Sequence, residues 1–113
     1  MDFRVLKNDE EVYIIEPQGN LDMFNSNQLK ELVMKLLERK VEKIVLDLKK
    51  VNAINSTGIG ALINISSTLK KLKTALAITN MNKPVQKAME ITKLSGYLPI
   101  VPNMKEAMEH FGS

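Results

Sequence analysis

The sequence of 113 residues lacks cysteine and tryptophan and has a single histidine. Without cysteine the chain has no disulfide, no thiolate nucleophile and no cysteine-based zinc or iron–sulfur site. The histidine, His110, lies three residues from the C-terminus on the polar side of an expected helix. We expect it to be exposed to solvent rather than to act as a general base, and we assign no Ser–His–Asp set and no metal site.

Long apolar runs are missing as well. No run approaches the roughly 20 residues that cross a bilayer, and the N-terminus lacks the layout of a signal peptide. We therefore expect a cytoplasmic protein with no membrane partner. Phosphate-binding patterns are also absent, because Gly58-Ile59-Gly60 lacks the third glycine of a dinucleotide fingerprint and no Walker A pattern occurs.

Aromatic residues make up only 4% of the chain, although its formal net charge is +3. So few aromatic rings give little surface for stacking nucleic-acid bases. The densest basic cluster, Lys70, Lys71 and Lys73, falls where a helix should end, and cations there complement the helix dipole. We expect no nucleic-acid partner.

The chain does contain enough apolar material for a core, with 44% hydrophobic and 26% charged residues. It shows no linker, internal repeat or low-complexity tract, so we expect residues 1–113 to form a single domain. Two alternating runs, Phe3–Lys7 and Glu11–Glu16, predict a hairpin at or near a sheet edge, closed by Pro17 and Gly19. Ile44–Leu48 is apolar on both faces apart from Asp47, which predicts a strand covered on both sides, and Ala75–Ile78 predicts another short buried strand. Pro99–Pro102 predicts a short extended piece.

Four helices are predicted from apolar residues at helical spacing. The first carries Leu29, Leu32, Val33, Leu36 and Leu37 on one stripe, with Asn25 as its N-cap and Gln28 in the capping-box position. In the second helix the residues expected to face inward are Ile59, Leu62, Ile63, Ser66 and Leu69. In the third, which starts near Pro84, they are Val85, Ala88, Met89 and Thr92. In the fourth, which follows Asn103, they are Met104, Ala107, Met108 and Phe111. Strands alternating with helices predict the α/β class, with a mixed, mostly parallel sheet of four to five strands.

The most informative segment is the run from Asn55 to Gly60, which follows a buried strand and leads into the second helix. A helix start offers free backbone N–H groups and the positive end of the dipole. Ser56 is therefore either an ordinary helix cap or a hydroxyl whose phosphorylation matters. Asp22, at the same sheet end, either caps or braces the first helix or forms an acidic lip beside the serine.

Asp47 offers an alternative site, because it ends a strand as the phosphoacceptor of a response regulator does. That chemistry needs an acidic pair and a metal nearby, which the first strand does not supply. We interpret Asp47 as a structural or surface carboxylate and expect no enzyme activity.

Two motifs carry a resemblance to a known family. Val51–Leu62 resembles the signature loop of bacterial anti-sigma factor antagonists of the STAS domain family, whose pattern is Asp-Ser-(Ser/Thr)-Gly-hydrophobic-Gly after a buried strand. Gly19-Asn20-Leu21-Asp22 similarly resembles their Gly-Glu-Leu-Asp motif before the first helix. The order of the expected elements agrees over nearly the whole chain, which implies a STAS-like fold.

The resemblance implies a phosphorylation switch. In that family a partner serine kinase, which is also the anti-sigma factor, phosphorylates the first hydroxyl after the acidic residue, and a serine phosphatase resets it. This position matches Ser56, with Thr57 as the alternative. ATP and magnesium belong to the kinase, so this chain needs no cofactor. The partner surface is expected to include Asp22, Asn55, Thr57, Gly58, Gly60, Ala61 and Ile65, the last being off the inward stripe of the second helix.

One position departs from the family pattern. Asn55 stands where the family has an aspartate, which leaves helix capping unchanged but removes a negative charge beside the acceptor hydroxyl. The alternative hypothesis is therefore a STAS interaction module that serves another regulatory or transport assembly without being phosphorylated.

Overall fold

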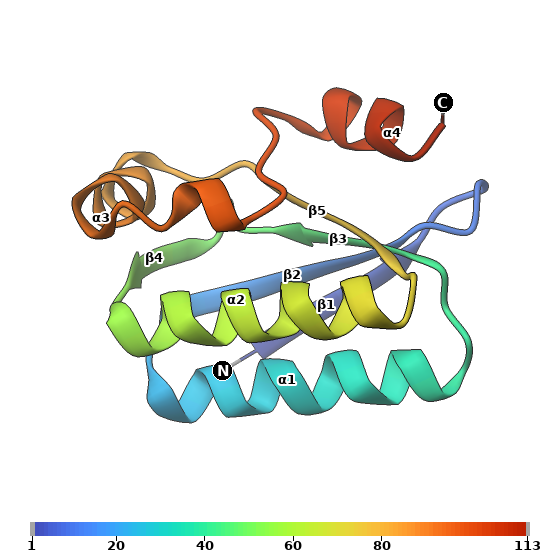
Figure 1. The fold of residues 1–113 in the computed structure, drawn as a ribbon, viewed down its shortest axis with the longest axis horizontal. Helices are drawn as coiled ribbons and strands as arrows, with labels where there is room; N and C mark the ends of the chain where they lie inside the picture. Colours follow the sequence, from blue (N-terminus) through green and yellow to red (C-terminus); the bar gives the residue numbers. More distant parts are fainter. Residues whose placement is uncertain (1, 113) are drawn as a thin grey trace.

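The computed structural model describes residues 2–112, so Met1 and Ser113 of the expected domain lie outside the described residues. A five-stranded sheet carries α1 (Met23–Glu38) and α2 (Ser56–Lys71) on one face and α4 (Met104–Gly112) on the other (Figure 1). Helix α3 (Lys83–Thr92) packs against β4 (Val51–Ile54) at one end of the sheet. The mixed α/β architecture predicted from the sequence is confirmed.

The sheet has the order β1-β2-β3-β5, and its strands are mostly parallel. Strand β1 (Asp2–Lys7) pairs with β2 (Tyr13–Leu21) as the antiparallel hairpin at the edge, as predicted. Strands β3 (Lys43–Asp47) and β5 (Ala75–Thr79) continue the sheet in parallel, and Ile100 adds a single parallel bridge to Ile78.

Strand β2 is longer than predicted, and the prediction that Pro17 and Gly19 close it was wrong. Its first half pairs with β3 up to Ile15, and its second half pairs with β4 from Gly19 onward. On the side of β3 and β4, Pro17 lies between these two ladders, so its missing N–H costs no hydrogen bond to either of those strands; on the other side it stands opposite Phe3 of β1. Gly19 has φ of +105°, and the register shifts directly after it. The sequence does not predict strand β4, because its four residues lie within the stretch that resembles the signature loop.

The core lies mainly between the sheet and helices α1 and α2, with a smaller cluster of Val12, Val45, Ala77 and Ala107 beneath α4. Strand β3 contributes to both, which confirms the prediction of a strand covered on both faces. The third helix ends at Thr92, where Lys93 takes a positive φ of 58°. The short segment Ser95–Tyr97 then forms a 3-10 turn rather than the end of that helix.

The buried face of α2 differs from the prediction at Ile65. This side chain was expected on the outer side, but it is fully buried together with Ile59, Leu62 and Leu69. Helix α2 packs against α1 as well as against the sheet, so its buried surface is wider than one helical stripe. Ile63, expected to point inward, is only partly buried.

We predict that Ile65→Ala lowers the free energy of unfolding by about 2–5 kcal/mol, because it removes a fully buried side chain and leaves a cavity. Ile91→Ala serves as the matched control, since Ile91 is 70% exposed and should change stability by less than about 0.5 kcal/mol. Urea unfolding measures both. Equal, small effects of the two substitutions would show that Ile65 is not part of the core.

Candidate functional site

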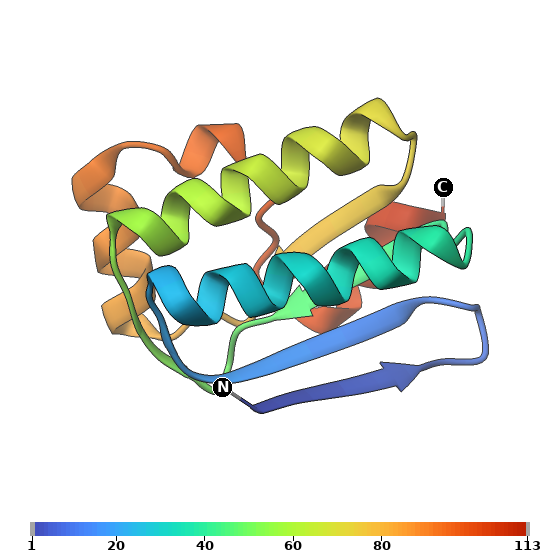
Figure 2. The ribbon, with the colours of Figure 1, turned by 90° about the horizontal axis from the view of Figure 1, so that it is seen from below.

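The starts of α1 and α2 lie side by side at the end of the sheet where β2 and β4 finish (Figure 2). Leu21 and Ile54, the last residues of these two strands, are partners in the parallel ladder. The backbone N–H of Asn55 donates to the carbonyl oxygen of Leu21 over 3.3 Å. The two motifs, separated by more than 30 residues in the sequence, are thereby joined into one surface.

Both helices are capped by the residue directly before them. Asp22 Oδ1 accepts a hydrogen bond from the N–H of Asn25, and Asn55 Oδ1 accepts one from the N–H of Gly58, each over 2.9 Å. The prediction of Asn25 as the first N-cap was therefore wrong; its side-chain amide donates instead to the carbonyl of Asn20. Asp22 serves as a cap, and it is half-buried at the site.

Ser56 is the first residue of α2 and is exposed, so the cap of this helix is Asn55 and not Ser56. The N–H groups of Ser56 and Thr57 belong to the first turn, where a helix provides no acceptor of its own. A negative charge placed here meets free donors and the positive end of the dipole. The hydroxyl of Ser56 is thus free of the capping role and lies where an added phosphate is electrostatically tolerated.

The two glycines of the loop have different roles. A side-chain carbon at Gly58 would lie 2.3 Å from the carbonyl oxygen of Leu21 and 2.8 Å from Ile54 Cγ1, so only glycine lets α2 approach β2 this closely. Gly58 is buried and cannot touch a partner directly. Gly60 is exposed and has open space around it, so no close backbone approach requires glycine there.

Of the other residues expected to meet a partner, Thr57 is exposed and Ala61 is half-buried on the first turns of α2. Ile65 is excluded as a contact by its complete burial. Two residues at this surface were missed: Met23 and Phe24, 66% and 69% exposed, stand in the first turn of α1. The sequence could have indicated their exposure, since both are large apolar residues that lie off the apolar stripe of their own helix.

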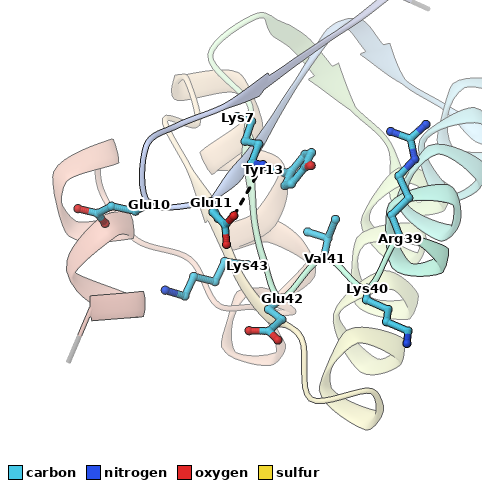
Figure 3. A pocket seen from close by; sticks show the side chains of 9 residues that line it. All are labelled: Lys7, Glu10, Glu11, Tyr13, Arg39, Lys40, Val41, Glu42 and Lys43. Atoms are coloured by element: carbon cyan, nitrogen blue, oxygen red, sulfur yellow. Dashed lines mark ion pairs between the residues drawn. The ribbon is translucent and has the colours of Figure 1, made fainter.

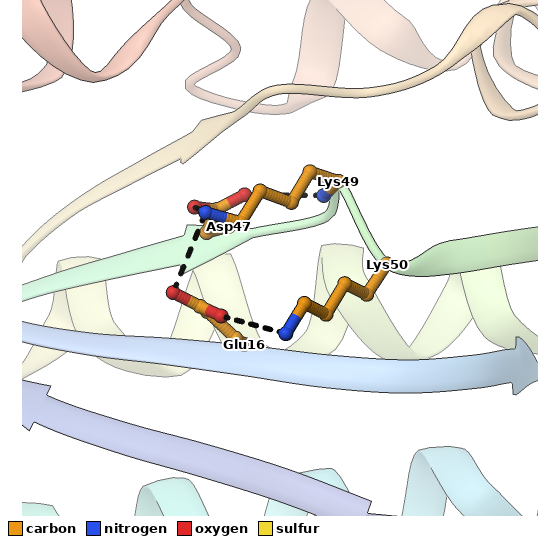
Figure 4. A network of polar contacts seen from close by, with 4 residues as sticks. All are labelled: Glu16, Asp47, Lys49 and Lys50. Carbon is orange, nitrogen blue, oxygen red and sulfur yellow. Dashed lines mark hydrogen bonds and ion pairs between the residues drawn. The ribbon is translucent and has the colours of Figure 1, made fainter.

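The alternative site at Asp47 takes part in an ion-pair network of two buried carboxylates and two half-exposed lysines (Figure 4). Lys49 Nζ lies 3.6 Å from Asp47 Oδ2 and 3.7 Å from Glu16 Oε2, and Lys50 Nζ lies 3.9 Å from Glu16 Oε1. Asp47 also accepts a hydrogen bond from the backbone N–H of Lys49. The carboxylate is buried rather than on the surface, and it holds the turn from β3 to β4, so its role is structural.

A polar hollow of about 300 Å³ lies at the opposite end of the sheet, beside the β1–β2 turn (Figure 3). Its lining mixes four basic and three acidic side chains, and Lys7 pairs with Glu11 over 3.9 Å and lies 5.7 Å from the centre of the Tyr13 ring. Such balanced charge gives no attraction for a ligand of one sign. The hollow is therefore a weaker candidate for the functional site than the surface around Ser56.

Within residues 2–112, no group of three or more His, Cys, Asp or Glu side chains is placed to hold a metal ion. The same described part of the chain contains no helix that is long and apolar enough to cross a membrane. His110 is exposed, as predicted, and its ring meets Phe111 edge-on at 5.5 Å between centroids.

Comparison with known proteins gives a consistent result. The family model described as the STAS domain matches residues 4–107. A Thermotoga neapolitana protein that bears the provisional name of an anti-sigma factor antagonist is 29% identical over 101 residues, covering 88% of this chain and 89% of that protein. The crystal structure of a Thermotoga maritima protein, with the same kind of provisional name, is 28% identical with a TM-score of 0.83, covering 95% and 92% of the two chains.

The anti-sigma factor antagonist SpoIIAA of Bacillus has the same fold in two states. Its unphosphorylated form matches with a TM-score of 0.76 at 17% identity, covering 97% of this chain and 96% of that chain. Its phosphorylated form matches with a TM-score of 0.70 at 15% identity, covering 97% and 99%. At these identities the likeness concerns the fold alone.

We predict opposite effects for the two loop glycines. Gly58→Ala should lose about 1–3 kcal/mol of stability or more, because the new carbon overlaps the Leu21 carbonyl. Gly60→Ala should gain up to about 1 kcal/mol, because an exposed helix position prefers alanine. Denaturant unfolding of both variants measures the difference. Equal losses would refute the close approach as the reason for glycine at position 58.

Proposed function

The chain belongs to the STAS domain family, and from that membership we propose that it acts as an anti-sigma factor antagonist, a regulatory binding protein rather than an enzyme. Its partner is an anti-sigma factor that is also a serine kinase, and the complex forms in the bacterial cytoplasm. Binding of the unphosphorylated chain releases a sigma factor for transcription. Phosphorylation at Ser56 ends the binding, and a serine phosphatase restores it.

One observation carries the switch: the Ser56 hydroxyl is exposed at the first position of α2, while the cap of that helix is made by Asn55. The hydroxyl can therefore be modified without removing a hydrogen bond that the helix start needs. Phosphorylation adds about −1.5 to −2 charges and three acceptor oxygens at this point. The free N–H groups and the dipole stabilise that charge by roughly 0.3–1 kcal/mol in an exposed position.

The same charge has a different effect in a complex. An interface that covers Ser56 would have to bury the phosphate away from water, which is costly unless a cation of the partner pairs with it. Each loss of about 1.4 kcal/mol weakens binding tenfold. The switch thus acts on the interface and leaves the fold unchanged.

The surface that a partner covers, here called the switch surface, consists of Met23, Phe24, Asn55, Ser56, Thr57, Gly60 and Ala61. None of these residues carries a charge, and the two from α1, Met23 and Phe24, are large, apolar and exposed. Aromatic residues in such positions often contribute most of the binding energy of an interface. Gly60 has no side chain and open space around it, so a partner can approach the helix closely at this position. Asp22 and Gly58 support this surface from beneath.

Phosphorylation is tested by incubating the chain with ATP and a candidate anti-sigma factor kinase from the same genome. The intact mass should rise by one phosphoryl group in the wild type and in Thr57→Ala, but not in Ser56→Ala. Asn55→Asp should be phosphorylated faster if the negative charge beside the hydroxyl helps the kinase, and its stability should hardly change because both residues cap equally well.

Complex formation without any mass gain would favour the alternative, an interaction module that works unphosphorylated. Mass gain that survives Ser56→Ala but disappears in Thr57→Ala would move the switch to the neighbouring hydroxyl. Neither complex nor mass gain with any such kinase of the genome would contradict the proposed function as a whole.

We predict that Phe24→Ala weakens binding to the anti-sigma factor by about 2 kcal/mol, roughly thirtyfold, because it removes a large anchor from the switch surface. The free protein should keep its stability within about 0.5 kcal/mol, since the ring is 69% exposed. Calorimetric titration gives the affinity. Leu72→Ala is the control, because Leu72 is 58% exposed at the far end of α2.

A further inference from the structure

Strand β1 forms an open edge of the sheet (Figure 2). The opposite edge, β5, is partly closed, because Ile78 exchanges backbone hydrogen bonds of 2.9 Å with Pro99 and Val101. Within residues 2–112 no strand pairs with the outer side of β1. Every second residue of an edge strand turns its N–H and C=O groups away from the sheet, so β1 presents a free ladder.

Three of the six residues of this edge, Asp2, Arg4 and Lys7, are charged, but the other features that keep edge strands apart are missing. Its six residues pair one to one with β2 from Asp2 to Lys7, without a bulge, a proline or a glycine. Val5 and Leu6 are 40% and 37% exposed. Lys7, a residue type that often protects an edge, is engaged by Glu11 and the Tyr13 ring at the hairpin end.

A hollow of about 380 Å³ lies between this strand and α1, lined by Phe3, Val5, Gln28, Glu31, Leu32 and Lys35. Phe3, Val5 and Leu32 are its apolar lining, and its polar lining includes Glu31 and Lys35, which are both exposed and have opposite charges. The edge and the hollow together form one continuous surface of backbone, apolar side chains and a charge pair.

We propose that this surface pairs with a second copy of the same chain, strand β1 against strand β1 in antiparallel orientation. Two edges related by a two-fold axis perpendicular to the sheet keep their helices on the same side and form one continuous sheet. The α1 helices of the two copies then run antiparallel across the axis. Glu31 of each copy faces Lys35 of the other, so the polar lining is complementary to itself.

The side chains select the register. An axis through Arg4 would set two guanidinium groups directly opposite each other, which is unfavourable. An axis through Val5 places Val5 opposite Val5 of the other copy and Leu6 opposite Arg4, and the two strands then pair from Phe3 to Lys7. This register also joins the two hollows over an apolar centre. The dimer therefore centres on Val5. It uses neither Ser56 nor any other residue of the switch surface.

The absence of native cysteine makes a direct test simple. Residues opposed across the axis have Cβ atoms about 4.5–5.5 Å apart, close enough for a disulfide after small adjustments. Val5→Cys should therefore form a covalent dimer under mild oxidation, seen by intact mass without reductant. Arg4→Cys should cross-link at least tenfold more slowly. Ile91→Cys, exposed on α3, sets the rate of random collision.

Sedimentation equilibrium of the wild type gives the dimer constant without any substitution. Glu31→Lys should weaken it roughly five- to tenfold by opposing like charges, and Glu31→Lys combined with Lys35→Glu should restore it. Both positions are exposed, so the fold is preserved in each variant. A wild type that remains monomeric at about 1 mM, or Val5→Cys that cross-links no faster than Ile91→Cys, would overturn the proposal.

Discussion

The close approach of α2 to the end of β2 is the constraint on which the proposed switch surface depends. Gly58 lies against the Leu21 carbonyl so tightly that no side chain fits, and the N–H of Asn55 donates to the same carbonyl. These contacts fix the start of α2 beside the start of α1. As a result the exposed residues Phe24, at the start of α1, and Ser56 and Gly60, at the start of α2, belong to two helix starts that lie side by side (Figure 2).

At the start of α2, one residue makes the structural hydrogen bond and its neighbour carries the hydroxyl that can be modified. Asn55 makes the hydrogen bond that starts the helix, and Ser56 carries a hydroxyl that the helix does not need. Charge added to Ser56 therefore meets the dipole and free N–H groups while the cap stays intact. The buried carboxylates of Glu16 and Asp47 act separately, by pairing with Lys49 and holding the turn that leads from β3 into β4.

Periodicity and motif spacing predicted the order of the main elements, the edge hairpin and the placement of the serine at a helix start. They did not predict β4 or the full length of β2. A proline ends a strand only where a ladder needs its N–H, and Pro17 lies between the ladders to β3 and β4. A glycine ends a strand only where the ladder needs an ordinary φ, and the strand has a bulge at Gly19. Ile65 was misplaced because one helical stripe describes a helix with one neighbour, whereas α2 packs against both the sheet and α1. Burial in such cases is set by tertiary packing, which a single sequence does not display.

We propose that phosphorylation of Ser56 changes an interface and leaves the fold unchanged. It is tested most directly by measuring the unfolding free energy and the affinity for the anti-sigma factor on the same phosphorylated and unphosphorylated samples. We expect phosphorylation to change the free energy of unfolding by less than about 1 kcal/mol and to weaken binding at least about tenfold. A phosphorylated chain that loses several kcal/mol of stability, or that binds its partner as tightly as before, would contradict it.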